Sequence, residues 1–77
     1  MNYGKAFKEI REERGFSRPA VASKIGCTPS ALSKIENGRT TPKEKTISRF
    51  CAVAQVPVAY FYQKALSMED YWSIGRP

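Results

Sequence analysis

Histidine is absent from this chain of 77 residues, and its two cysteines, Cys27 and Cys51, stand far apart. Without histidine, the commonest general base of enzymes is missing. Two thiols cannot supply the four nitrogen or sulfur ligands of a usual zinc site. Glu12 and Glu13 are adjacent, so on a helix they point about 100° apart and make no catalytic pair. We therefore expect no enzyme, metal or cofactor, and reduced cysteines in a core, as in a cytoplasmic protein.

Long apolar runs are missing too. No stretch approaches the length of a membrane span, and residues 1–15 alternate charged and apolar side chains, unlike a signal peptide. Apolar residues nevertheless make up 42% of the chain, which is too many for a disordered polypeptide. We expect one small domain with a core just large enough to fold unaided, and no membrane partner.

Positive charge gathers in the first part of the chain. Residues 1–49 contain 11 lysines and arginines against 5 acidic residues, whereas residues 50–77 contain two of each sign. The whole net charge of +6 therefore belongs to the first part. A basic face suits a polyanion such as nucleic acid. On charge alone, a basic helix face that only keeps a small protein soluble is an equal alternative.

Glycines and prolines mark the ends of five expected helices. Glycine is favoured just past a helix end, and three glycines follow stretches of helical periodicity: Gly15, Gly26 and Gly38. Proline is tolerated in a first turn, and four prolines stand where one would begin: Pro19, Pro29, Pro42 and Pro57. Ser17, Thr28 and Thr41 are good N-caps, and residues 41–44 read as a capping box. We expect a compact all-α fold with helices near residues 3–14, 17–25, 28–37, 42–54 and 57–66.

The segment 28–38 predicts a short helix with two different faces. Leu32 and Ile35 fall on one side and would enter the core, which leaves Ser30, Ser33 and Lys34 pointing outward. Another short helix and a glycine turn precede it, and this arrangement lays a helix into the major groove of DNA. The alternative is an ordinary solvated face.

These residues resemble a known family. Residues 7–61 are similar to the lambda-repressor-like helix-turn-helix domain of the phage-repressor and Cro group, the xenobiotic-response-element family. The resemblance lies in Ala22 at the helix crossing, Gly26 in the turn, and the run from Ile35 to Gly38 with Pro42 four residues on. It implies a DNA-binding domain over residues 1–66, with the helix-turn-helix at 17–37. One departure is Arg18, because the family usually carries glutamine there. We expect Arg18 to keep a phosphate contact and to lose some bracing of the recognition helix.

The resemblance also implies roles for single residues. The expected contacts to bases come from Thr28, Pro29, Ser30, Ser33 and Lys34, and those to phosphates from Arg18, Asn37 and Arg39. In the family, Asn37 would present its amide and its backbone N–H to a phosphate, although Asn-Gly is also an ordinary turn pair. Arg11 and Glu36 are expected to form a structural ion pair. Lys34 is the best candidate for a guanine contact, and with so sparse a face, selectivity should lean partly on DNA shape.

The resemblance implies a sequence-specific transcriptional regulator, a repressor or autoregulator of a phage, mobile element, restriction–modification or toxin–antitoxin system. The alternative is a small adaptor or antitoxin that uses the same fold to bind protein. The last helix carries more apolar surface than one stripe requires, which predicts a homodimer on a palindromic operator through Val58, Tyr60, Phe61 and Tyr62. The tail, residues 67–77, contains Tyr71, Trp72 and Ile74 and is a candidate dimer or partner contact.

Overall fold

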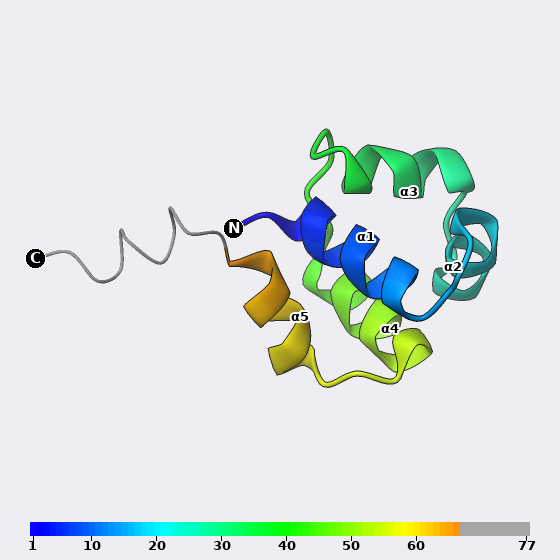
Figure 1. The fold of residues 1–77 in the computed structure, drawn as a ribbon. Coiled ribbons are helices and arrows are strands. Elements are labelled where there is room, and N and C mark those ends of the chain that lie inside the picture. Colours follow the sequence, from blue (N-terminus) through cyan, green and yellow to red (C-terminus); the bar gives the residue numbers. More distant parts are fainter. Residues whose placement is uncertain (67–77) are drawn as a thin grey trace, which may run out of the picture.

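A computed structural model of the chain describes residues 1–66 (Figure 1). They form five helices: α1 (Tyr3–Glu13), α2 (Arg18–Ile25), α3 (Pro29–Glu36), α4 (Glu44–Ala54) and α5 (Val58–Ala65). Within this described part there is no strand, and no helix is long and apolar enough to span a membrane. The predicted five-helix, all-α fold is confirmed. The expected tail contact, residues 67–77, lies outside the described residues.

The helix-turn-helix begins and ends through local hydrogen bonds. Ser17 caps α2, where its Oγ accepts from the backbone N–H of Ala20 at 3.2 Å. Thr28 caps α3 in the same way, with its Oγ1 accepting from Ala31 N–H at 3.0 Å. Gly26 ends α2 with φ of 80°, a left-handed conformation that glycine adopts without the strain of a Cβ. Both caps and the turn were predicted from the sequence.

The start of α4 differs from the prediction. Helix α4 begins at Glu44, its cap residue is Lys43, and no side chain caps it, so the expected capping box of residues 41–44 is absent. Pro42 is buried just ahead of the helix. A threonine followed by proline can begin a helix, as Thr28 and Pro29 do at α3, so the pair Thr41 and Pro42 does not by itself account for the later start of α4. Similarly, Pro57 lies before α5 as its cap residue, outside the first turn.

Three phenylalanines form the centre of the core. Phe7 of α1, Phe50 of α4 and Phe61 of α5 are all fully buried. The ring of Phe7 stacks on that of Phe50 with centroids 4.3 Å apart, and meets the ring of Phe61 edge to face at 5.3 Å. This cluster joins α1, α4 and α5. The helix-turn-helix packs against it, with α2 contacting α4 and α3 contacting α1.

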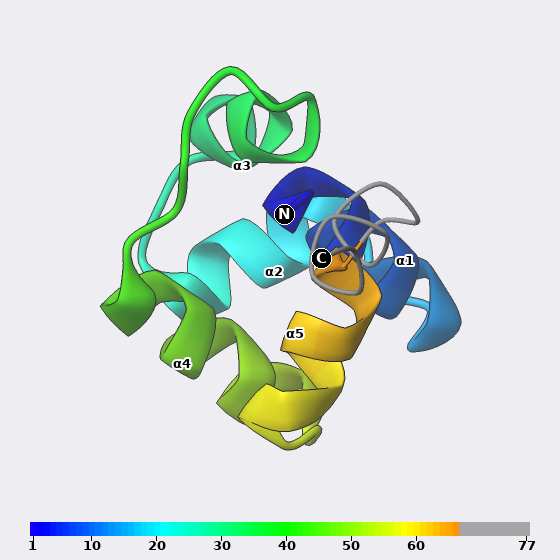
Figure 2. The same ribbon diagram turned by 90° about the vertical axis from the view of Figure 1, so that its left-hand side faces the viewer.

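Helix α3 lies at one edge of the domain. It packs against α1 and α2, whereas α5 lies toward the opposite side (Figures 1 and 2). Leu32 is fully buried and Ile35 nearly so, which anchors the inner face of α3. The outer face of α3 is therefore turned away from the rest of the domain.

Helix α5 is held to α1 by polar contacts at the surface. The hydroxyl of Tyr60 and the ammonium of Lys64 both donate to the carboxylate of Glu13, at 2.9 Å and 2.8 Å. The hydrogen bond from Lys64 is the largest cause of a lowered pKa at Glu13. Asn2 N–H donates to the carbonyl of Ala65 at 2.7 Å, so the beginning of the chain meets the end of α5.

Candidate nucleic-acid interface

The outer face of α3 carries the residues expected to read bases. Thr28, Pro29, Ser30 and Lys34 are exposed, and Ser33 is half-buried. These side chains are small and polar, apart from the proline ring and one ammonium. The structure brings the five residues onto one surface, and their contact with bases remains a prediction.

Asn37 continues this face at the end of α3. Its amide Nδ2 donates to the hydroxyl of Ser33 at 3.4 Å, a long and adaptable contact. Its backbone N–H donates to the carbonyl of Ser33 at 2.9 Å. That N–H is therefore occupied within the helix end, which corrects the expectation that it faces a phosphate. Only the exposed side-chain amide remains for a ligand.

Glu36 is the best-buried charge among the described residues, and two arginines share it. Its side chain is 1% exposed. Arg11 grips the carboxylate through Nε at 2.8 Å and Nη2 at 3.2 Å, and Arg18 donates through Nε at 3.0 Å. Arg11 also donates through Nη1 to the carbonyl of Phe16 at 3.0 Å. The expected ion pair is present, and it joins α1, the loop before α2, and α3.

The hydrogen bond with Glu36 is the largest influence on Arg11, and it raises the pKa of that guanidinium against the opposing effect of burial. The positive charge of Arg11 is thus secured beside the carboxylate. One buried carboxylate flanked by two guanidiniums leaves a net positive charge over the three groups, and Arg18 is the more exposed of the two arginines.

Arg18, which was expected to lose some bracing of the recognition helix, does contribute to that bracing. Its Nε bonds to Glu36, so it holds α3 to the start of α2 directly, while its side chain stays 43% exposed. A guanidinium has five N–H donors, so one edge can bind Glu36 while the terminal nitrogens face solvent. Arg18 therefore braces α3, and its contact to phosphate stays a prediction.

We expect Arg18→Gln, which restores the residue usual in the family, to lower the free energy of unfolding by roughly 0.5–1 kcal/mol, since a half-exposed ion pair is worth little more. Chemical denaturation measures the change. The control is Arg14→Gln, which removes an exposed arginine at the end of α1. Equal stabilities for Arg18→Gln and Arg14→Gln would show that the bond to Glu36 contributes nothing.

Arg39 follows α3 in a turn held by the backbone. Gly38 has φ of 78°, its N–H donates to the carbonyl of Ile35 at 3.1 Å, and Arg39 N–H donates to the carbonyl of Lys34 at 2.9 Å. These two backbone hydrogen bonds fix the direction in which the chain leaves α3. Arg39 is exposed beside the outer face of α3, where the resemblance placed a phosphate contact.

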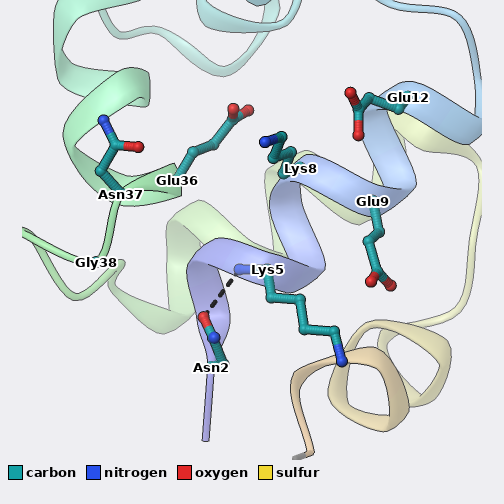
Figure 3. Close-up of a pocket in the computed structure, with 8 residues that line it drawn as sticks. All are labelled: Asn2, Lys5, Lys8, Glu9, Glu12, Glu36, Asn37 and Gly38. Atoms are coloured by element: carbon teal, nitrogen blue, oxygen red, sulfur yellow. Dashed lines mark hydrogen bonds between the residues drawn. The ribbon is translucent and has the colours of Figure 1, made fainter.

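Two features were missed from the sequence. Arg49 of α4 brings its Nη1 to 3.8 Å from the point where a Cβ on Gly26 would lie, so it adds a positive charge at the turn of the helix-turn-helix. An open pocket of about 490 Å³ also lies between the start of α1 and the end of α3 (Figure 3). It is lined by Asn2, Lys5, Lys8, Glu9, Glu12, Glu36, Asn37 and Gly38. These residues are distant in sequence, so no local pattern signals the pocket.

The expected dimer surface is only partly available. Val58 is 41% exposed, and Tyr60 and Tyr62 are half-buried. Phe61 is fully buried in the domain's own core against Phe7 and Phe50. Phe61 is therefore removed from the predicted interface, because a side chain enclosed by its own domain cannot meet a partner.

Comparison with known proteins agrees with this architecture. A family model described as a helix-turn-helix domain matches residues 3–60. The chain is 39% identical over 56 residues to RghRB of Bacillus subtilis strain 168, an uncharacterized HTH-type transcriptional regulator, covering 71% of this chain and 40% of that protein. It is 30% identical over 77 residues to the HTH-type transcriptional repressor RghR of the same strain, covering 99% and 57%. The chain thus spans about half the length of these relatives.

A phage protein and a solved structure are also similar. The ImmF control region 10 kDa protein of Bacillus phage phi105 is 39% identical over 46 residues, 60% of this chain and 51% of that protein. The crystal structure of the clp gene regulator ClgR from Corynebacterium glutamicum superposes with a TM-score of 0.80 at 23% identity, over 83% of this chain and 68% of that one, which shows a shared fold. From the family match and this architecture, the chain belongs to the helix-turn-helix domain family, as its likeness to the phage-repressor and Cro group predicted.

Proposed function

We propose that the chain is a transcriptional regulator that binds double-stranded DNA sequence-specifically, with residues 1–66 as the DNA-binding domain and α3 in the major groove. The observation that carries the proposal is the contrast between the two faces of α3. The inner face is fixed by Leu32, Ile35 and the shared carboxylate of Glu36, whereas the outer face is exposed and polar. A rigidly held helix with a free polar face is what groove reading requires.

The proposed contacts divide into two kinds. Thr28, Pro29, Ser30, Ser33 and Lys34 would meet base edges, with Lys34 on guanine and the Pro29 ring on a thymine methyl group. Arg18 and Arg39, at opposite ends of the helix-turn-helix, would meet phosphates together with the side-chain amide of Asn37. Phosphate contacts fix the register of a protein on the duplex without reading sequence. The serines discriminate weakly, so DNA shape would supply part of the selectivity.

The proposal extends to assembly and biological role. One recognition helix reads few base pairs, so two copies would sit about 34 Å apart on a palindromic operator, with Val58, Tyr60 and Tyr62 at the contact between them. RghR is named a repressor, and the phi105 protein belongs to a phage control region. Both names support a repressor or autoregulator of a phage or mobile element, acting in the cytoplasm by binding and without catalysis.

Lys34→Ala and Arg39→Ala should fail in different ways. On a duplex selected from a randomised pool, Lys34→Ala should lose roughly 1–3 kcal/mol of binding free energy and relax the preference at one base pair per half-site. Arg39→Ala should weaken selected and scrambled duplexes by similar factors and lower the salt slope by about one unit per subunit. Titrations at several salt concentrations measure both effects.

The matched control is Lys64→Ala, which removes a positive charge from α5, far from α3, where it pairs with Glu13. It should leave base preference and salt slope unchanged. If Lys34→Ala weakens both duplexes equally and keeps base preference, the outer face of α3 is not the reading surface. If the wild type binds no duplex even at low salt, the proposal of DNA binding fails, and the alternative of an adaptor that binds protein through the same fold is favoured instead.

A further inference from the structure

Gly4 of α1 is a point of very close approach between two helices. The residue is buried and faces the carboxyl end of α3. A Cβ at this position would lie 2.5 Å from the carbonyl oxygens of both Ile35 and Glu36, and 2.9 Å from the carbonyl carbon of Glu36. Real Cβ atoms essentially never approach closer than 3.0 Å. The neighbours are backbone atoms, so no side chain can turn aside to make room.

This glycine differs from the three glycines that end helices. Gly15, Gly26 and Gly38 have positive φ, and the backbone conformation explains them. Gly4 lies inside α1 with ordinary helical backbone, where alanine would normally be preferred. Its requirement is therefore spatial: only a residue without Cβ lets α1 and α3 pack at this distance.

The close approach sits directly under the last turn of α3. The carbonyl of Ile35 that faces Gly4 also accepts the N–H of Gly38 at 3.1 Å. A shift of that carbonyl would thus carry the turn of residues 37–39 with it. Asn37 and Gly38 line the open pocket between α1 and α3, which is also lined by Asn2 and Lys5 at the start of α1 (Figure 3). The position of this turn relative to α1 is consequently set at Gly4.

We propose that Gly4 is a positioning residue for DNA binding: its missing side chain sets the distance between α1 and the end of α3, and so places Asn37 and Arg39 against the DNA backbone. This inference rests on the proposed function, because the two residues matter for binding only if DNA lies along α3. Moving from the approach of 2.5 Å to an ordinary contact of 3.4 Å would need a displacement of about 1 Å, enough to misalign a hydrogen bond to a phosphate.

The sign of the change in stability is the first test. Gly4→Ala at an ordinary helix position would raise the melting temperature, since alanine favours helix. We expect it to fall instead. In the free protein, the backbone amide resonances of residues 36–40 should shift more than those of the start of α3. The control is Ile47→Ala, a buried position in α4 that lowers stability without touching this contact.

DNA affinity is the measurement that distinguishes a positioning role of Gly4 from a purely structural one. Gly4→Ala should weaken binding to the selected duplex by roughly tenfold, the size of one lost contact. Its effect on affinity should not add to that of Asn37→Ala: the double variant should bind DNA with about the same affinity as whichever single variant binds less tightly. Its effect should add to that of Ser30→Ala, at the other end of α3. Ile47→Ala should add to both.

Several results would overturn the inference: a raised melting temperature, amide shifts no larger at residues 36–40 than at the start of α3, or full additivity between Gly4→Ala and Asn37→Ala. If Asn37→Ala binds as the wild type does, the DNA role of Gly4 fails while DNA binding itself stands. If the wild type binds no duplex, the proposed function fails, and the amide shifts alone decide whether Gly4 places the turn. Should Gly4→Ala be unfolded, trimethylamine N-oxide, which favours compact states, allows the same measurements.

Discussion

Replacing Glu36 by alanine is expected to lower the free energy of unfolding by about 3–5 kcal/mol, because it leaves the nearly buried guanidinium of Arg11 without its counter-charge. The side chain of Arg11 is only 11% exposed, so water cannot fully replace the carboxylate. Arg18 would lose its Nε partner at the same time. Helix α3 should loosen, and DNA binding should weaken on every sequence alike, since no base contact is removed. Chemical denaturation and duplex titration measure the two effects.

The pair of arginines makes the test specific. Arg11→Ala should destabilise the domain to a similar degree, and the double variant with Glu36→Ala should fall well short of the sum. Glu36→Gln is the control, because it keeps the shape and an acceptor oxygen while removing the charge, and it should destabilise less than alanine. Additive effects, together with a melting temperature that barely moves, would mean that the network does not hold α3.

Replacing Phe61 by alanine should cost about 3–5 kcal/mol, because it removes a fully buried ring from the centre of the core. The rings of Phe7 and Phe50 would each lose an edge-to-face neighbour, at 5.3 Å and 6.2 Å. A small domain has little stability in reserve, so much of the population should be unfolded at 37 °C. Circular dichroism during denaturation measures the loss.

Val58→Ala is the matched change on the exposed side of the same helix. It should leave the free energy of unfolding of the monomer within about 0.5 kcal/mol of the wild type, and weaken self-association in sedimentation. If Val58→Ala leaves the sedimentation of a dimeric wild type unaltered, the proposed contact lies elsewhere. If Phe61→Ala proves nearly as stable as the wild type, the description of the core is wrong.

Local signals predicted the helix-turn-helix well. The cap hydroxyls of Ser17 and Thr28 and the positive φ of Gly26 act on residues within a few positions, so their effect can be derived from the sequence. The start of α4 shows the limit of this reasoning. The capping box predicted a start at Pro42, whereas Pro42 is buried ahead of the helix and α4 begins two residues later, at Glu44.

The remaining differences from the prediction concern contacts between distant residues. Arg18 braces α3 because Glu36, 18 residues further on, lies within reach of its Nε. Phe61 turns inward because α1 and α4 bring two rings to it, although its neighbours Tyr60 and Tyr62 are partly exposed. Gly4 gave no signal at all, since its role depends on the carbonyls of α3. Such contacts follow from the packing of helices, which the spacing of residues along one helix does not contain.

The most direct test of the central claim is a titration of the isotope-labelled protein with a selected duplex, followed by the shifts of its backbone amide resonances at moderate salt. DNA reading by the outer face of α3 predicts the largest shifts at Arg18, across residues 28–34 and at residues 37–39. The part of α5 that faces away from α3 should change little. The same titration with a scrambled duplex should move Arg18 and residues 37–39 more than residues 28–34. Shifts concentrated on α5, or none at all with either duplex, would contradict the account.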